Sequence, residues 1–219
     1  MTQSLLPPSH DVPQPSGSGF GGISRPAARL HLIVTRIMII VGSVRDGRKG
    51  IAVAEWVRSR LSRIEGVEVD FADLKEIGLP LMTEPNHPRF QQYTQPTTIA
   101  WSRRVEAADA FLVVMPEYNF SYTAPVKNAF DHLSQEWSRK GIGFVSYGGV
   151  SAGTRAVATF QVVVTSLGLV KTKTNVEIPM FAQFFDDGGE FVPNEILEKA
   201  LADQVAELVR LDGALATLR

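Results

Sequence analysis

Residues 37–50 read IMIIVGSVRDGRKG, and this stretch decides the fold. Its first five residues are all apolar and Gly42 ends the run, which is typical of a strand buried on both faces of a sheet. Beyond the glycine-containing loop, residues 51–61 carry apolar side chains at helical spacing. A buried strand that leads through such a loop into a helix indicates an α/β fold with a parallel sheet.

The same alternation continues to the end of the chain. Further strands are predicted at residues 67–71, 110–115, 142–145 and 175–178, and further helices at 98–108, 126–133, 154–167 and 194–215. Five strands that alternate with helices predict a doubly wound parallel sheet. Residues 78–96 contain four prolines and form the one loop long enough to suggest a function.

Composition narrows the classes of protein. The 219 residues are 44% apolar and carry a net charge of −1, which fits one α/β domain and gives no general attraction to nucleic acid or to a membrane surface. No cysteine is present, which excludes disulfides, a thiol nucleophile and the cysteine-dependent small tyrosine phosphatases. The four histidines show no zinc-binding spacing, so we expect no metal site.

Residues 1–35 differ from the rest because they are rich in proline and glycine and show no apolar period. We expect a disordered N-terminal tail, or a start assigned upstream of the true one, followed by a domain at residues 36–219. A transit peptide is the alternative, since Arg25, Arg29 and Arg36 face a single acid, Asp11.

The loop after the first strand is a candidate phosphate site. Gly42 and Gly50 let the backbone turn closely around a ligand, and the following helix presents free N–H groups to an anion. Ser43 can donate a hydroxyl, and Arg45, Arg48 and Lys49 supply positive charge. The alternative is a solvated basic turn.

The spacing in this loop matches neither common nucleotide motif. It is not GxGxxG, and although it approaches a P-loop, Arg48 stands where lysine is needed and Lys49 where a magnesium-binding hydroxyl is needed. A terminal phosphate monoester is therefore the better candidate.

Two more loops follow buried strands and should reach the same edge of the sheet. Residues 116–121, PEYNFS, offer amide, hydroxyl and aromatic groups that suit a planar polar ring and its polyol chain. Alternatively, Asn119 and Ser121 only form a turn and Tyr118 packs on the core. Residues 146–151, SYGGVS, form another glycine loop that ends at a helix.

These segments together are similar to one known family. GSVRDGRKG (42–50), PEYNFSYTAPVKNAFDHL (116–133) and SYGGVSAGTRA (146–156) resemble the NADPH-dependent FMN reductases over residues 37–178. The resemblance implies a flavodoxin-like three-layer sandwich whose five-stranded parallel sheet has the order 2-1-3-4-5. It also implies bound FMN, NADPH or NADH as hydride donor, and a homodimer or homotetramer in the cytoplasm.

The resemblance also assigns residues to the cofactor. Ser43, Arg45 and Arg48 would meet the FMN phosphate, Glu117, Tyr118 and Asn119 the ribityl chain and ring edge, and Tyr147, Gly148 and Gly149 the pyrimidine end. Many relatives carry a Ser or Asn where this chain has residues 48–50, which implies a more basic phosphate site here. The full predicted set is Gly42, Ser43, Arg45, Arg48, Lys49, Gly50, Pro116, Glu117, Tyr118, Asn119, Ser121, Tyr147, Gly148 and Gly149.

The implied activity is hydride transfer from NAD(P)H through FMN to a small acceptor such as a flavin, a quinone or an azo compound, by a ping-pong mechanism. No catalytic side chain is expected, because the cofactor carries the reaction. Lys127 and Asp131, four residues apart, are either an exposed helical pair or part of a subunit interface. The alternative functions are an electron carrier like flavodoxin, an FMN-binding sensor and, third, an NTPase.

Overall fold

Successive residues of strand β1 (Thr35–Val41) enter two different hydrophobic cores. Met38 and Ile40 pack with helices α3 (Pro96–Glu106), α4 (Ala124–Asp131) and α5 (Thr154–Ser166). Ile37, Ile39 and Val41 pack with α1 (Gly50–Leu61) and α6 (Glu195–Leu215) on the other face. This alternation is the two-residue period of a strand with both faces covered.

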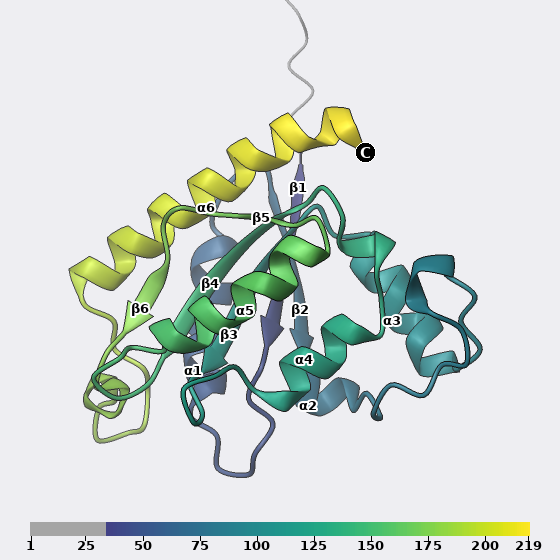
Figure 1. Cartoon of the computed structure of the whole chain (residues 1–219). Coiled ribbons are helices and arrows are strands. Elements are labelled where there is room, and N and C mark those ends of the chain that lie inside the picture. The colour runs from purple at the N-terminus through teal and green to yellow at the C-terminus, as the bar shows by residue number, and fades with distance from the viewer. Residues whose placement is uncertain (1–33) are drawn as a thin grey trace, which may run out of the picture. The chain divides into compact units, whose positions relative to one another are not determined.

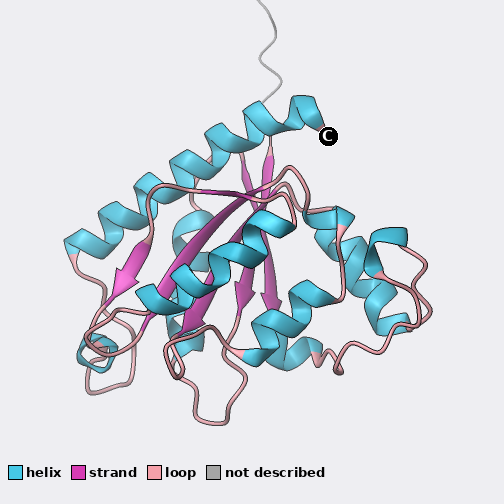
Figure 2. Ribbon diagram, in the orientation of Figure 1, coloured by secondary structure: helices cyan, strands magenta, loops and turns pink. Residues whose placement is uncertain are grey.

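The computed structural model describes residues 34–219, which form three layers with the sheet in the middle (Figures 1 and 2). Strands β2 (Val67–Asp73), β1, β3 (Ala110–Pro116), β4 (Gly141–Tyr147) and β5 (Val170–Lys171) lie in the order β2-β1-β3-β4-β5, and all pairs are parallel. The predicted three-layer sandwich and strand order are confirmed. Val41 lies opposite Asp73 and Val114, so the loops after these strands leave from one edge.

The fifth position of the sheet differs from the expected single strand at residues 175–178. Two short strands share it: β5 pairs with the start of β4, and β6 (Val176–Ile178) pairs with its end. Between them the buried Gln204 side chain of α6 donates to the carbonyl oxygens of Phe144 and Thr174, at 3.1 and 2.8 Å. Because that amide takes up the carbonyl of Phe144, the edge strand is interrupted here.

The segment between β2 and α3 is mainly irregular, as its prolines predict. It begins with the short helix α2 (Leu74–Ile77), which the sequence analysis did not predict. The Glu84 carboxylate then accepts hydrogen bonds from the N–H groups of Thr94 and Gln95, at 2.7 and 3.0 Å, and closes the loop on itself. Short 3₁₀ turns lie at Pro88–Phe90, Gln135–Trp137, Phe181–Phe184 and Ala216–Leu218.

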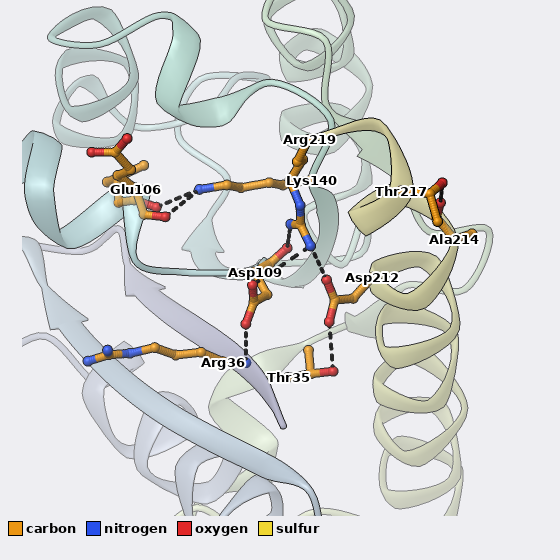
Figure 3. A network of polar contacts seen from close by, with 10 residues as sticks. Thr35, Arg36, Glu106, Asp109, Lys140, Asp212, Ala214, Thr217 and Arg219 are labelled. Atoms are coloured by element: carbon orange, nitrogen blue, oxygen red, sulfur yellow. Dashed lines mark hydrogen bonds and ion pairs between the residues drawn. The ribbon is translucent and has the colours of Figure 1, made fainter. Parts of the chain in front are cut away.

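A polar network joins the elements at the opposite edge, where the strands begin (Figure 3). The Thr35 hydroxyl donates to the buried Asp212 carboxylate at 2.9 Å, and Arg219 pairs with the same carboxylate. Lys140 donates to the carbonyl oxygens of Val105 and Glu106, at 2.9 and 3.0 Å. The network therefore ties the C-terminal ends of α6 and α3 to the starts of β1 and β4.

The prediction of a disordered tail falls almost entirely on residues 1–33, which lie outside the described residues. Strand β1 begins at Thr35, the last residue of the predicted tail. Among residues 34–219, no helix combines the length and the apolar character that crossing a membrane requires.

Candidate functional site

The loops after β1, β3 and β4 meet around a cavity of about 110 Å³ at the carboxyl edge of the sheet. Nine of the predicted cofactor residues line it, together with Phe181, which was not predicted. The predicted ones are Ser43, Arg45, Lys49, Gly50, Pro116, Glu117, Tyr118, Tyr147 and Gly148. Open parallel sheets bind ligands at this edge, where the strand order reverses next to β1.

The N-terminus of α1 forms one end of the cavity. No side chain caps this helix, so its first N–H groups remain free to bind an anion. Arg45 and Lys49 stand beside it, and within residues 34–219 neither makes an ion pair. Free amide groups, two cations and the Ser43 hydroxyl make this end suitable for a phosphate group.

Arg48 lies apart from the cavity, although it belongs to the same loop. Its guanidinium forms a bidentate pair with Asp73 at the end of β2, with both N–O distances at 2.5 Å, and donates to the Ser43 carbonyl at 2.7 Å. The hydrogen bond to Asp73 raises the pKa of Arg48. Arg48 therefore holds the shape of the loop, whereas Arg45 and Lys49 face the cavity.

Gly42 also lies behind the lining residues, where close packing explains the glycine. A Cβ atom at this position would overlap the side chain of Val126 in α4. The buried Thr123 hydroxyl donates to the Gly42 carbonyl at 2.7 Å. The start of the loop after β1 is thus fixed against the start of α4.

The loop after β3 contains a strained turn. Tyr118 and Ser121 exchange two backbone hydrogen bonds, and the residues between them, Asn119 and Phe120, both have positive φ, at 49° and 66°. This is a type I′ turn, which favours Asn at its first central position and Gly rather than Phe at its second. Pro116, Glu117 and Tyr118 line the cavity, and Asn119 and Ser121 do not.

The Glu117 carboxylate lies in the cavity wall with a side chain only 6% exposed. The Nε atom of Arg155, at the start of α5, donates to it at 2.6 Å. Burial raises the pKa of Glu117, but hydrogen bonds from Arg155 and Ser151 outweigh it and hold the pKa below its usual value. Glu117 is therefore a carboxylate already neutralised by its partner and offers no free acid or base.

The loop after β4 supplies Tyr147 and Gly148. The Tyr147 ring covers Gly50 so closely that a Cβ atom there would overlap the phenol hydroxyl. Burial raises the pKa of Tyr147, so the hydroxyl stays protonated as a donor beside Ser43. The side chain thus reaches the end of the cavity at α1, while Gly148 lines the cavity beside Glu117.

The N–H groups that follow Gly148 are available to a ligand. Among the described residues, Gly149, Val150 and Ser151 have no acceptor for their backbone N–H groups, although Gly149 does not line the cavity. The loop closes at Gly153, where φ is +83° and a Cβ atom would overlap the backbone of Tyr147. A turn this tight requires glycine at that position.

Aromatic residues from the segment after β6 complete the site. The Phe181 ring packs against Tyr147 at a tilt of 34°, with 4.6 Å between the ring centroids, and Phe185 packs against Phe181 and under Lys49. Trp101 and Trp137, by contrast, are buried in the core. Phe181 lies beyond the last motif, and only the aromatic-rich run FAQFF at 181–185 signals it.

Lys127 and Asp131 form an ion pair within α4 at 2.6 Å. They line a separate hollow of about 700 Å³ between α4, α5 and the loop at residues 81–88. Its lining includes the apolar residues Leu81, Met82, Phe130, Leu133, Val163 and Leu167.

Among the described residues, no cluster of three or more histidine or acidic side chains is placed to hold a metal ion.

Comparison with known proteins finds flavin and quinone reductases. A family model described as NADPH-dependent FMN reductase matches residues 35–183. An NAD(P)H-dependent FMN reductase of Schizosaccharomyces pombe is 39% identical over 127 residues, which are 57% of this chain and 64% of that protein. An NAD(P)H:quinone oxidoreductase of Solanum tuberosum is 32% identical over 130 residues, 56% of this chain and 63% of that protein. The chain thus spans less than two thirds of these relatives.

The fold has solved counterparts. The flavoenzyme NAD(P)H:(acceptor) oxidoreductase of Paracoccus denitrificans superposes with a TM-score of 0.61 at 22% identity, over 82% of this chain and 98% of that one. A flavodoxin from Streptococcus pneumonia superposes with a TM-score of 0.52 at 16% identity, over 80% and 99% of the two chains. At these identities the likeness establishes a flavodoxin-like fold.

Proposed function

Because this chain belongs to the NADPH-dependent FMN reductase family, we propose that it binds FMN between its three loops and passes hydride from NAD(P)H to a small acceptor. The observation that carries the proposal is the cavity itself. It has an anion-binding end at α1, is lined elsewhere by the loops after β3 and β4, and has no catalytic side chain among its lining residues. Such a site suits a ligand that brings its own chemistry.

The residues present fit the phosphate of FMN. The uncapped helix start, the Ser43 hydroxyl and the charges of Arg45 and Lys49 would hold it, and the Tyr147 hydroxyl adds a neutral donor. All of these groups can donate a hydrogen bond to a phosphate oxygen. Only the two hydroxyls can also accept one at neutral pH. This end would therefore favour FMN over riboflavin, which has no phosphate.

The size of the cavity suggests which parts of the cofactor it would enclose. Pockets that hold a drug-sized ligand measure roughly 300–1,000 Å³, whereas this cavity holds about 110 Å³. The phosphate and the polyol chain would occupy it, and the ring would lie at its mouth beside Tyr118, which is 42% exposed. The free N–H groups after Gly148 would then face the polar edge of the ring.

FMN supplies hydride acceptance and release when it is bound. The residues of this chain bind and orient it, and Glu117, paired with Arg155, presents no free base to the site. A ring held at the mouth of the cavity has one accessible face, so NAD(P)H and the acceptor would use that face in turn. We therefore expect parallel lines in double-reciprocal plots, and intersecting lines would argue for simultaneous binding.

Two features of the purified protein test the proposal. We expect a yellow protein that releases FMN on denaturation, as identified by chromatography, and that consumes NAD(P)H when a quinone, an azo dye or free flavin is added. A protein that takes up no flavin would refute the proposal. A protein that binds FMN but consumes no NAD(P)H would favour an electron carrier or a sensor. A cytoplasmic homodimer belongs to the same proposal and rests on family membership.

A further inference from the structure

A single arginine of α5 occupies both oxygens of the Glu117 carboxylate. The side-chain nitrogens of Arg155 contact Oε1 at 2.6 and 2.5 Å, and its backbone N–H donates to Oε2 at 3.1 Å. Because Glu117 is almost fully buried, it depends on this partner for compensation of its charge. The loop after β3 is thus bound to the first turn of α5.

The same guanidinium also contacts the strained turn. It lies 3.7 Å from the centroid of the Phe120 ring, which is 64% exposed and has the positive φ of 66° described above. One helical turn further along α5, the Thr159 hydroxyl lies 3.3 Å from that of Ser121. A bulky residue with positive φ persists only where its surroundings hold it there, and α5 supplies those surroundings.

We propose that Arg155 is a positioning residue that clamps the turn at residues 117–121 onto α5 and so keeps the Glu117 and Tyr118 wall of the cavity preformed. α5 begins directly after the loop that follows β4, so Arg155 connects two of the three loops of the site. Arg155 itself is not among the residues that line the cavity. A preformed wall lowers the ordering cost of binding, and this functional consequence rests on the proposed binding of FMN.

The clamp itself is testable without any ligand. Backbone hydrogen exchange of residues 117–121 in the flavin-free protein should be about tenfold faster in Arg155→Met, because local opening becomes easier. Arg103→Met is the matched control, since Arg103 is an exposed arginine of α3 with no ion pair among residues 34–219. Exchange in this control should remain at the wild-type rate.

A second variant distinguishes two roles of Arg155, which are to hold the turn in place and to neutralise the charge of Glu117. Arg155→Met leaves the Glu117 charge buried and unpaired, whereas the double variant Glu117→Gln/Arg155→Met removes both charges. The double variant should regain stability but keep the fast exchange of the turn, because the contact with Phe120 is still missing. Wild-type exchange in the double variant would overturn the proposal, since Arg155 would then only neutralise Glu117.

Ligand affinity tests the consequence for the site. Arg155→Met should weaken the binding of FMN and of riboflavin by the same factor, about tenfold. The reason is that the Glu117 and Tyr118 wall would contact a part of the molecule that both ligands share. Loss of FMN affinity alone would show that Arg155 contacts the phosphate, and unchanged affinity for both would show that the clamp does not serve the site. Either result overturns the proposal. If the wild type binds no flavin, the proposed function fails, and the exchange rates still decide whether Arg155 clamps the turn.

Discussion

Arg45 and Arg48 stand three positions apart in one loop and have different surroundings. Arg45 lines the cavity with no ion-pair partner among the described residues, while Arg48 is held by Asp73 and by the Ser43 carbonyl. The sequence predicts a phosphate contact for both. It does not separate them, because the partner of Arg48 lies 25 residues away at the end of another strand.

Arg45→Ala should therefore weaken FMN binding and leave riboflavin binding unchanged. The loss of one charged hydrogen-bond partner costs about 1.5–3 kcal/mol, which corresponds to roughly tenfold to a hundredfold in affinity. Titration of both ligands by flavin fluorescence measures the two affinities.

Arg48→Ala is the internal control for this experiment. It leaves Asp73 without its arginine partner and should lower the melting temperature, while the ratio of FMN to riboflavin affinity falls less than in Arg45→Ala. If Arg48→Ala rather than Arg45→Ala lowered this ratio, the assignment of the two arginines would be reversed.

At the scale of elements, β4 links the site to the opposite edge of the sheet. Its end carries Tyr147 and Gly148 into the site, and its start follows Lys140, a buried lysine whose Nζ atom donates to two carbonyls at the end of α3 (Figure 3). Burial lowers the pKa of Lys140 to about 8. The charge of this lysine therefore opposes folding at neutral pH.

Lys140 should make stability depend on pH in the alkaline range. Between pH 8 and about 10.5 the unfolded chain binds the proton that the folded chain has lost, so the free energy of unfolding rises with pH in this window. From pH 8 to 10 the free energy of unfolding of the wild type should rise by on the order of 2 kcal/mol relative to that of Lys140→Met. Urea unfolding of both proteins at the two pH values measures the difference, in which the tyrosines common to both cancel. A constant difference would contradict the lowered pKa.

The elements show which parts of the fold the sequence predicts. Runs such as residues 110–115 are apolar throughout, which predicts strands buried on both faces, and the structure has a strand there. The order of the strands is implied by the resemblance to the FMN reductases, and it is confirmed. The division of the edge strand into β5 and β6 depends on Gln204, more than 25 residues further on, which no local pattern can show. In the same way, the motifs locate the three loops, whereas Phe181 and the contact of Arg155 with Phe120 become apparent only in three dimensions.

At the scale of the whole molecule, the hollow beside α4 is the candidate for a subunit interface. The hollow of about 700 Å³ beside α4 is lined largely by apolar side chains, and Leu81 at its rim is 78% exposed. Apolar side chains gathered at a surface hollow suit contact with a second protein.

A second copy of this chain is the partner that the family suggests, so we expect a homodimer in solution. Light scattering should give twice the mass of the chain, and Leu81→Glu should shift the protein toward the monomer, because a charge placed in a buried interface is unfavourable. Exposed Val162→Glu, on the outward face of α5, is the comparison variant. A wild-type protein that is monomeric and fully active would contradict this expectation.

The central claim is that the three loops hold an FMN that takes hydride directly from NAD(P)H, and rapid anaerobic mixing tests it most directly. The FMN-loaded protein is mixed with NADPH, or with NADH, without any acceptor, and the visible flavin absorbance is followed. We expect this absorbance to disappear at a rate at least equal to kcat measured with a quinone. Absorbance that persists, or that decays much more slowly than turnover, would contradict it.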